Sequence, residues 1–138
     1  MIDANKRAPS RRPIGRQHDQ KILIVDDEPN IVISLEFMMK REGFEVATAA
    51  DGDAALAQVA AFAPDLVLLD VMMPNKSGYE VCEILRADPA RAGLRIVMLT
   101  AKGRETEVAK GIALGADAYV TKPFSTKDLV AQVKSLLG

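Results

Sequence analysis

The chain has 138 residues, of which 49% are hydrophobic, and a formal net charge of −1. This length suits one domain rather than two, and the hydrophobic content excludes a globally disordered chain. Its single cysteine, Cys82, cannot form an internal disulfide, and no apolar run reaches the roughly 18 residues of a membrane span. We therefore expect a cytoplasmic globular protein that does not contact a membrane.

The charge is unevenly distributed along the chain. Residues 1–20 contain five basic and two acidic residues, a balance of +3, whereas the other 118 residues contain 13 basic and 17 acidic ones, a balance of −4. The first 20 residues include two prolines and a glycine and show no apolar periodicity. We expect 1–20 to be a flexible basic N-terminal arm and 21–138 to be one folded domain.

The first elements alternate between strand and helix. Residues 22–25 form an apolar run that ends at two acids, as in a strand that is buried on both faces. Pro29 suits the first turn of a helix, and the apolar residues after it keep helical spacing until Gly43. The following patterns predict a strand at 44–48, a helix at 51–62 and a strand at 66–69 that ends at Asp70.

The second half continues this alternation. It predicts a helix at 79–86, a strand at 94–99 that ends at Thr100, a helix at 105–114, a strand at 118–120 that leads to Lys122, and a helix at 126–137. Five strands that alternate with five helices predict an α/β fold, a doubly wound five-stranded parallel sheet with helices on both faces.

Open sheets of this kind bind ligands outside the carboxyl ends of their strands. The residues predicted at that edge are Asp26, Asp27, Asp70, Thr100 and Lys122. Three neighbouring carboxylates repel one another unless a cation lies among them, and an oxygen-only ligand set favours Mg²⁺. The sequence contains no G-x-x-x-x-G-K-[ST] phosphate loop, which disfavours nucleotide binding.

A carboxylate can instead accept a phosphoryl group as a nucleophile. The transferred group then needs its oxygens neutralised, which a metal on Asp26 and Asp27, the Thr100 hydroxyl and the Lys122 ammonium could do. Asp70 is the expected acceptor because the third strand is central. Taken singly, the acid pair could merely cap a helix, Thr100 could be an ordinary strand residue and Lys122 could be solvated; their coincidence favours one site.

Four segments, ILIVDDEPN, PDLVLLDVMMPNKSGYE, IVMLTAK and GADAYVTKPF, resemble those of the receiver domain of two-component response regulators. The resemblance covers about residues 21–137 and implies a flavodoxin-like (βα)5 fold. It implies that Asp70 is the phospho-acceptor and that Asp26, Asp27, Asp70 and the backbone carbonyl of Met72 hold Mg²⁺. It also implies that Thr100 carries the switch hydroxyl and that Tyr119 is the aromatic residue that turns inward with it. Lys122 would bind the phosphoryl group, oriented by a cis Lys122–Pro123 bond.

The implied function is a phosphorelay receiver. A sensor histidine kinase or a histidine phosphotransfer protein would donate the phosphoryl group, and a downstream output protein would bind the face of the fourth helix, last strand and last helix. A phosphorylation-dependent homodimer could use the same face, as in receivers of transcription-factor regulators. Many of those carry two acids in a GADDY pattern, whereas this sequence has GADAY, with Ala118 in place of the second acid. Direct DNA binding is not expected.

The sequence favours a single-domain regulator that catalyses its own Mg²⁺-dependent phosphorylation and its slow dephosphorylation. Three alternatives to this interpretation are left open. It could be a receiver excised from a larger regulator with a DNA-binding output domain, or a pseudo-receiver that binds partners without phosphorylation. It could also be a phosphatase with an aspartyl intermediate, although Met72 stands where that chemistry needs a second acid.

Two residues are expected to set the lifetime of the phosphorylated state. Met72 and Lys102 lie two residues beyond Asp70 and Thr100, where they could flank the path of attacking water. A methionine orients no water and a lysine could pair with the phosphoryl group, so we expect slow autodephosphorylation.

Overall fold

A computed structural model describes residues 20–101 and 105–138, with the side chains of 105–108 excepted. Its strands are β1 (Lys21–Val25), β2 (Glu45–Ala49), β3 (Leu66–Asp70), β4 (Arg95–Ala101) and β5 (Ala118–Lys122). Its helices are α1 (Pro29–Arg41), α2 (Gly52–Phe62), α3 (Gly78–Ala87), α4 (Glu105–Ala113) and α5 (Thr126–Leu137), with a short 3₁₀ turn, η2 (Pro89–Arg91), after α3. The predicted alternation of strands and helices is confirmed.

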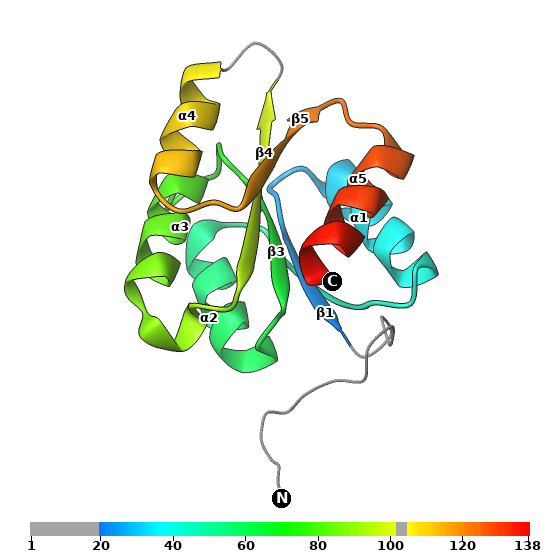
Figure 1. Cartoon of the computed structure of the whole chain (residues 1–138), viewed down its shortest axis with the longest axis horizontal. Helices are drawn as coiled ribbons and strands as arrows, with labels where there is room; N and C mark the ends of the chain where they lie inside the picture. Colours follow the sequence, from blue (N-terminus) through cyan, green and yellow to red (C-terminus); the bar gives the residue numbers. More distant parts are fainter. Residues whose placement is uncertain (1–19, 102–104) are drawn as a thin grey trace, which may run out of the picture.

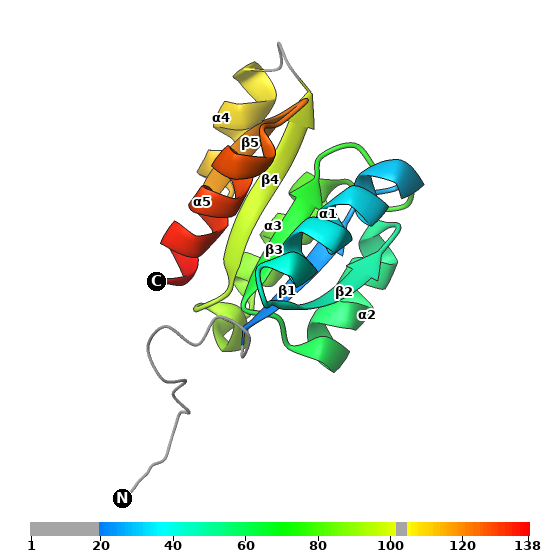
Figure 2. The ribbon, with the colours of Figure 1, turned by 90° about the vertical axis from the view of Figure 1, so that its right-hand side faces the viewer.

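The five strands form one parallel sheet in the order β2-β1-β3-β4-β5. Helices α1 and α5 cover one face, and α2, α3 and α4 cover the other (Figures 1 and 2). The chain runs from β1 to one neighbour, β2, and then crosses to the other neighbour, β3. This change of direction leaves a crevice at the carboxyl ends of β1 and β3, where sheets of this kind place their sites.

Both faces of the central strands are buried, which explains their continuous apolar sequence. On β1, Leu23 and Val25 face the core beneath α2 and α3, whereas Ile22 and Ile24 face the core beneath α1 and α5. All five residues of β3 are buried. A polar side chain at the end of such a strand is therefore held rigidly at the sheet edge.

Gln20 belongs to the folded part, although the sequence analysis placed it in the arm. It is half-buried, its carbonyl oxygen accepts a hydrogen bond from the Glu45 amide (3.0 Å), and its Nε2 donates to the carbonyl oxygen of Leu137 (3.3 Å). The predicted arm at 1–19 and Lys102 lie outside the described residues. In the part of the chain that the structure covers, no helix is long and apolar enough to cross a membrane.

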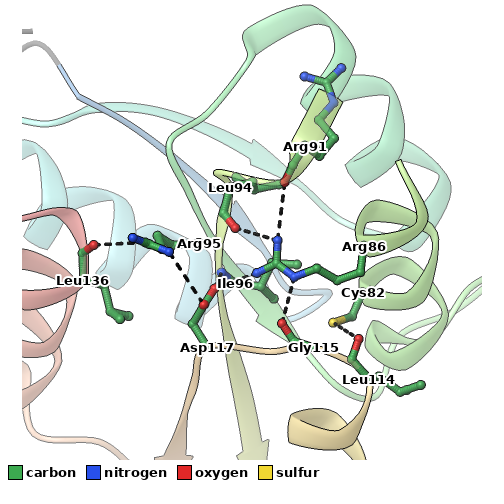
Figure 3. A network of polar contacts seen from close by, with 10 residues as sticks. All are labelled: Cys82, Arg86, Arg91, Leu94, Arg95, Ile96, Leu114, Gly115, Asp117 and Leu136. Carbon is green, nitrogen blue, oxygen red and sulfur yellow. Dashed lines mark hydrogen bonds and ion pairs between the residues drawn. The ribbon is translucent and has the colours of Figure 1, made fainter. Parts of the chain in front are cut away.

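A polar network ties α3, β4, α5 and the turn before β5 together at the edge of the sheet opposite the crevice (Figure 3). The Arg86 guanidinium donates to Asp117 Oδ2 (2.7 Å) and to the carbonyl oxygens of Gly115 (2.8 Å) and Leu94 (2.7 Å). Asp117 Oδ2 also accepts from the Ile96 amide (2.8 Å). Both charged side chains are mostly covered, so removal of either breaks several hydrogen bonds at a site that water reaches poorly.

We expect Arg86→Met to lower the free energy of unfolding by about 2 kcal/mol, since it removes the ion-pair partner of the mostly covered Asp117 carboxylate and the donor to two backbone carbonyls. The control is Lys40→Met, which removes an exposed ion pair with Glu36 on α1 and should cost less than about 0.5 kcal/mol. Urea denaturation measures both values, and equal losses in the two variants would contradict a structural role for the Arg86 network.

Candidate functional site

Three carboxylates converge at the carboxyl ends of β1 and β3. Asp26 and Asp70 are buried, Asp27 is exposed, and one oxygen from each lies within 4.8 Å of the others. The Asp26 side chain is held in place by the loop after β1, because its Oδ1 accepts a hydrogen bond from the Glu28 amide (2.9 Å). Its amide in turn donates to the carbonyl oxygen of Ala49 in β2 (3.2 Å).

Lys122, the last residue of β5, brings a cation into this cluster. Its Nζ lies 2.8 Å from Asp26 Oδ2, 3.3 Å from Asp70 Oδ1 and 3.3 Å from Glu28 Oε1. The Lys122–Pro123 peptide bond is cis, as the resemblance implied. Sequence reasoning missed Glu28, although its place directly after the acid pair was a usable signal.

The charges of the cluster perturb one another. Burial, and next the charge of Asp26, raise the pKa of Asp70 to about 6, although the Lys122 ammonium opposes this rise. Burial alone would lower the pKa of Lys122, but its hydrogen bond to Asp26 and the charges of Asp70 and Asp26 raise it on balance. At neutral pH the site therefore holds mutually repelling carboxylates around one ammonium, and excess negative charge favours a further cation.

The raised pKa of Asp70 has a consequence for stability. Between about pH 4 and pH 6 folded Asp70 binds a proton that the unfolded chain has released, so stability falls as pH rises through this window. We expect metal-free Asp70→Asn to exceed wild type by about 1–2 kcal/mol in free energy of unfolding near pH 7.5, after discounting for partial solvation. Near pH 4 the difference should vanish.

Urea denaturation in EDTA at the two pH values measures this effect. The matched control is Asp128→Asn, which removes an exposed carboxylate from the first turn of α5 and should show no comparable gain at the higher pH. Equal stability of Asp70→Asn and wild type at both pH values would contradict the unfavourable burial of the Asp70 charge.

Thr100 lies on β4 beside the cluster. It is 2% exposed, and its hydroxyl oxygen has no hydrogen-bond partner in the described part of the chain. The neighbouring backbone of β4 pairs with β5, with Thr100 opposite Thr121 and Ala101 opposite Lys122. Tyr119 on β5 is 42% exposed, so its inward orientation stays a prediction for the phosphorylated state.

Two further features surround the cluster. Met72 lies in the loop between β3 and α3, and its side chain is exposed. A hollow of about 240 Å³ opens beside the acid pair, lined by Asp26, Asp27, three residues of α1, the last two residues of β2 and Ala50 after it. Apolar side chains thus line one approach to the carboxylates.

The donor set fits a hard divalent cation. It offers carboxylate oxygens from Asp26, Asp27 and Asp70, which approach closely enough to share one ion, and such an ion would offset the repulsion that raises the pKa of Asp70. The same edge presents the Thr100 hydroxyl, which no described residue pairs with, and the Lys122 ammonium, and both are suited to a phosphoryl oxygen. A nucleophilic carboxylate with these neighbours matches the needs of phosphoryl transfer.

Comparison with known proteins gives one consistent family. The family model of the response regulator receiver domain matches residues 22–134. The chain belongs to the response regulator receiver family. It is 48% identical over 118 residues to the DNA-binding response regulator MtrA of Mycolicibacterium smegmatis, and 47% identical over 117 residues to the phosphate regulon regulatory protein PhoB of Rhizobium meliloti.

These alignments cover 86% and 85% of this chain but 50% and 52% of the two relatives. The receiver chain therefore spans about half the length of these curated relatives. Among solved structures, the chemotaxis response regulator CheY4 of Vibrio cholerae is similar with a TM-score of 0.80 at 32% identity, over 85% of this chain and 98% of that one. The receiver family and its five-stranded α/β fold, predicted from the sequence, are confirmed.

Proposed function

We propose that the chain is a phospho-accepting receiver in which Asp70 takes a phosphoryl group from a phosphohistidine. The observation that carries this proposal is the convergence of two buried carboxylates, Asp26 and Asp70, on the ammonium of Lys122 at the sheet edge. A structural ion pair would need one acid, whereas this arrangement provides an acceptor, further oxygen ligands and a cation for the incoming phosphoryl oxygens.

Each residue then has one role. Asp70 Oδ attacks the phosphorus, and the bond between phosphorus and the donor nitrogen breaks as the new acyl phosphate bond forms. Asp26, Asp27, Asp70 and the backbone carbonyl of Met72 would hold Mg²⁺, which neutralises charge on the phosphoryl oxygens. Lys122 binds a second oxygen. The buried hydroxyl of Thr100, which has no partner among the described residues, donates to a third.

Phosphorylation would then shift a two-state equilibrium. Movement of Thr100 toward the phosphoryl group and of Tyr119 inward would remodel the face formed by α4, β5 and α5, which the output protein binds. Ile112 of α4 and Tyr119 of β5 are exposed apolar residues of these elements. A homodimer through the same face would lack the carboxylate that Ala118 replaces, and Asp117 is already bound to Arg86 within the chain.

The donor in this proposal is a sensor histidine kinase or a histidine phosphotransfer protein in the cytoplasm. The larger context has two versions. The chain could act as a single-domain regulator, as its match to 98% of CheY4 favours, or as the receiver half of a regulator with a DNA-binding output domain, as its match to half of MtrA favours. The phosphatase alternative loses its support, because family membership explains the aspartate cluster and Met72 offers no proton.

The test of the proposal is the dependence of phosphorylation on Mg²⁺. We expect acetyl phosphate with Mg²⁺ to add one phosphoryl group per chain, seen by intact-protein mass spectrometry, and EDTA to prevent it. Labelling that is equally fast in EDTA would contradict the metal role, and absence of labelling under all conditions would favour the pseudo-receiver alternative.

We also predict slow hydrolysis of the acyl phosphate, because Met72 orients no water beside Asp70. Met72→Asn together with Lys102→Ala should shorten its half-life about tenfold, a small part of the roughly 10²- to 10⁴-fold that full general acid–base assistance to a reacting water contributes. Loss of radiolabel after removal of acetyl phosphate measures this half-life. The control is Met38→Leu on the buried side of α1, and an unchanged half-life in the double variant would contradict the lifetime role.

A further inference from the structure

The loop between β3 and α3, which carries Met72, is held by the start of α2. Asn75 Nδ2 donates a hydrogen bond to Asp51 Oδ2 (3.0 Å). The other carboxylate oxygen of Asp51 caps α2 by accepting from the Ala54 amide (2.7 Å). One side chain therefore fixes both the first turn of α2 and the middle of the loop.

Close packing at Gly52 holds the same part of the loop. A Cβ atom on Gly52 would lie 2.5 Å from both the Cβ and the carbonyl oxygen of Lys76, so only glycine allows the loop to approach α2 this closely. Asn75 itself has a φ of 69°, a left-handed conformation that asparagine tolerates better than most residues. The bent conformation of the loop is therefore stabilised by its contacts with Asp51 and Gly52 at the start of α2.

The end of β2, just before Asp51 and Gly52, contacts the acid pair. The carbonyl oxygen of Ala49 accepts from the amide of Asp26 (3.2 Å), and residues 48–50 line the hollow beside Asp26 and Asp27. Residues 49–52 therefore connect the loop that bears Met72 to the strand end that bears the acid pair. These two parts of the chain are more than 40 residues apart in sequence and share the proposed metal site.

We propose that Asp51, Gly52 and Asn75 are positioning residues of the metal site: they set the distance between the Met72 loop and the acid pair, and so tune the affinity for Mg²⁺ and the rate of phosphorylation. This inference rests on the proposed function. None of the three touches the reacting atoms. Supporting contacts of this kind commonly change metal affinity by about tenfold or more when they are removed.

The hydrogen bond can be broken and restored by exchange of its partners. Asn75→Asp keeps the size of the side chain and its tolerance of a left-handed backbone but places two carboxylates in contact. Asp51→Asn with Asn75→Asp restores the bond with the donor on the other side, while the amide oxygen of residue 51 still caps α2. Gln58→Glu, about two turns beyond Asp51 along α2, is the control for the added charge.

Isothermal titration with Mg²⁺ and the rate of labelling by acetyl phosphate are measured for each variant. We expect Asn75→Asp to raise the Kd for Mg²⁺ about tenfold and the exchanged double variant to return to within about twofold of wild type. An added carboxylate would by itself attract Mg²⁺, so weaker binding reports the displaced loop. Gln58→Glu should bind Mg²⁺ as wild type does.

Gly52→Ala tests the packing contact without loss of helix stability, because alanine is the stronger helix former. It should weaken Mg²⁺ binding by about tenfold or more while the thermal unfolding temperature stays within a few degrees of wild type. Unchanged Mg²⁺ affinity in both Asn75→Asp and Gly52→Ala, or a double variant as weak as Asn75→Asp, would overturn the inference. Wild-type protein that binds no Mg²⁺ would overturn the proposed function first.

Discussion

Asp70→Asn should abolish phosphorylation by acetyl phosphate and Mg²⁺. Asparagine keeps the size and the position of the side chain at the end of β3 but offers no carboxylate nucleophile, so no acyl phosphate can form. The variant remains folded, because burial and the charge of Asp26 already disfavour a charge at this position. We expect labelling to fall below the detection limit of intact-protein mass spectrometry.

The matched control is Asp128→Asn on α5, which should be labelled as fully as wild type. Circular dichroism of both variants verifies that they are folded. Persistent stoichiometric labelling of Asp70→Asn would place the acceptor elsewhere and overturn the assignment of Asp70.

Lys122→Gln is expected to have the second largest effect, and it should move two measurements in opposite directions. Loss of the ammonium removes the charge that we propose binds a phosphoryl oxygen, and we expect labelling at saturating Mg²⁺ to slow by about 100-fold. The same change frees Asp26 and Asp70 from their ion pairs with Lys122 and should lower the Kd for Mg²⁺. Under the proposed function, Lys122 would therefore compete with the metal for carboxylates and also assist the transfer.

The pKa of Asp70 gives an independent measure of this variant. Because the Lys122 ammonium holds that pKa down, its removal should raise the pKa above its present value of about 6. The carboxyl resonance of Asp70 in NMR titrations of metal-free protein reports the shift. Lys122→Arg keeps the charge and should retain a pKa close to that of wild type. An unchanged labelling rate in Lys122→Gln would contradict the catalytic role of this lysine.

The arrangement of strands and helices could be predicted because the residues that start and stop each helix agree with the apolar periodicity between them. Pro29 starts α1 and Gly43, at a φ of 93°, follows its end. The closing helix, Thr126–Leu137, also has the predicted bounds. Two helix starts differ by one residue where a side chain caps the helix: Asp51 precedes α2, and Ser77 forms a capping box with Glu80 before α3. Strands β2 to β5 each end one or two residues later than predicted, because their pairing continues into the residues at the sheet edge.

The candidate site could be predicted only at the level of which strand ends meet. Strand order brings Asp26 and Asp70 together, because β1 and β3 are neighbours, and this follows from the doubly wound pattern. Pairing of Lys122 with Glu28 and contact of Asn75 with Asp51 depend instead on loop conformations. Such conformations are set by tertiary packing and leave no periodic signal in the sequence.

The most direct test of the central claim is to locate the phosphoryl group on the chain. Wild-type protein is treated with acetyl phosphate and Mg²⁺, and the acyl phosphate is reduced with borohydride, which converts the modified aspartate to homoserine. Peptide mass spectrometry then identifies the position. We predict homoserine at residue 70, with the peptides that contain Asp26 and Asp27 unchanged. Homoserine at another aspartate, or none in protein that binds Mg²⁺, would contradict the assignment of Asp70 as the acceptor.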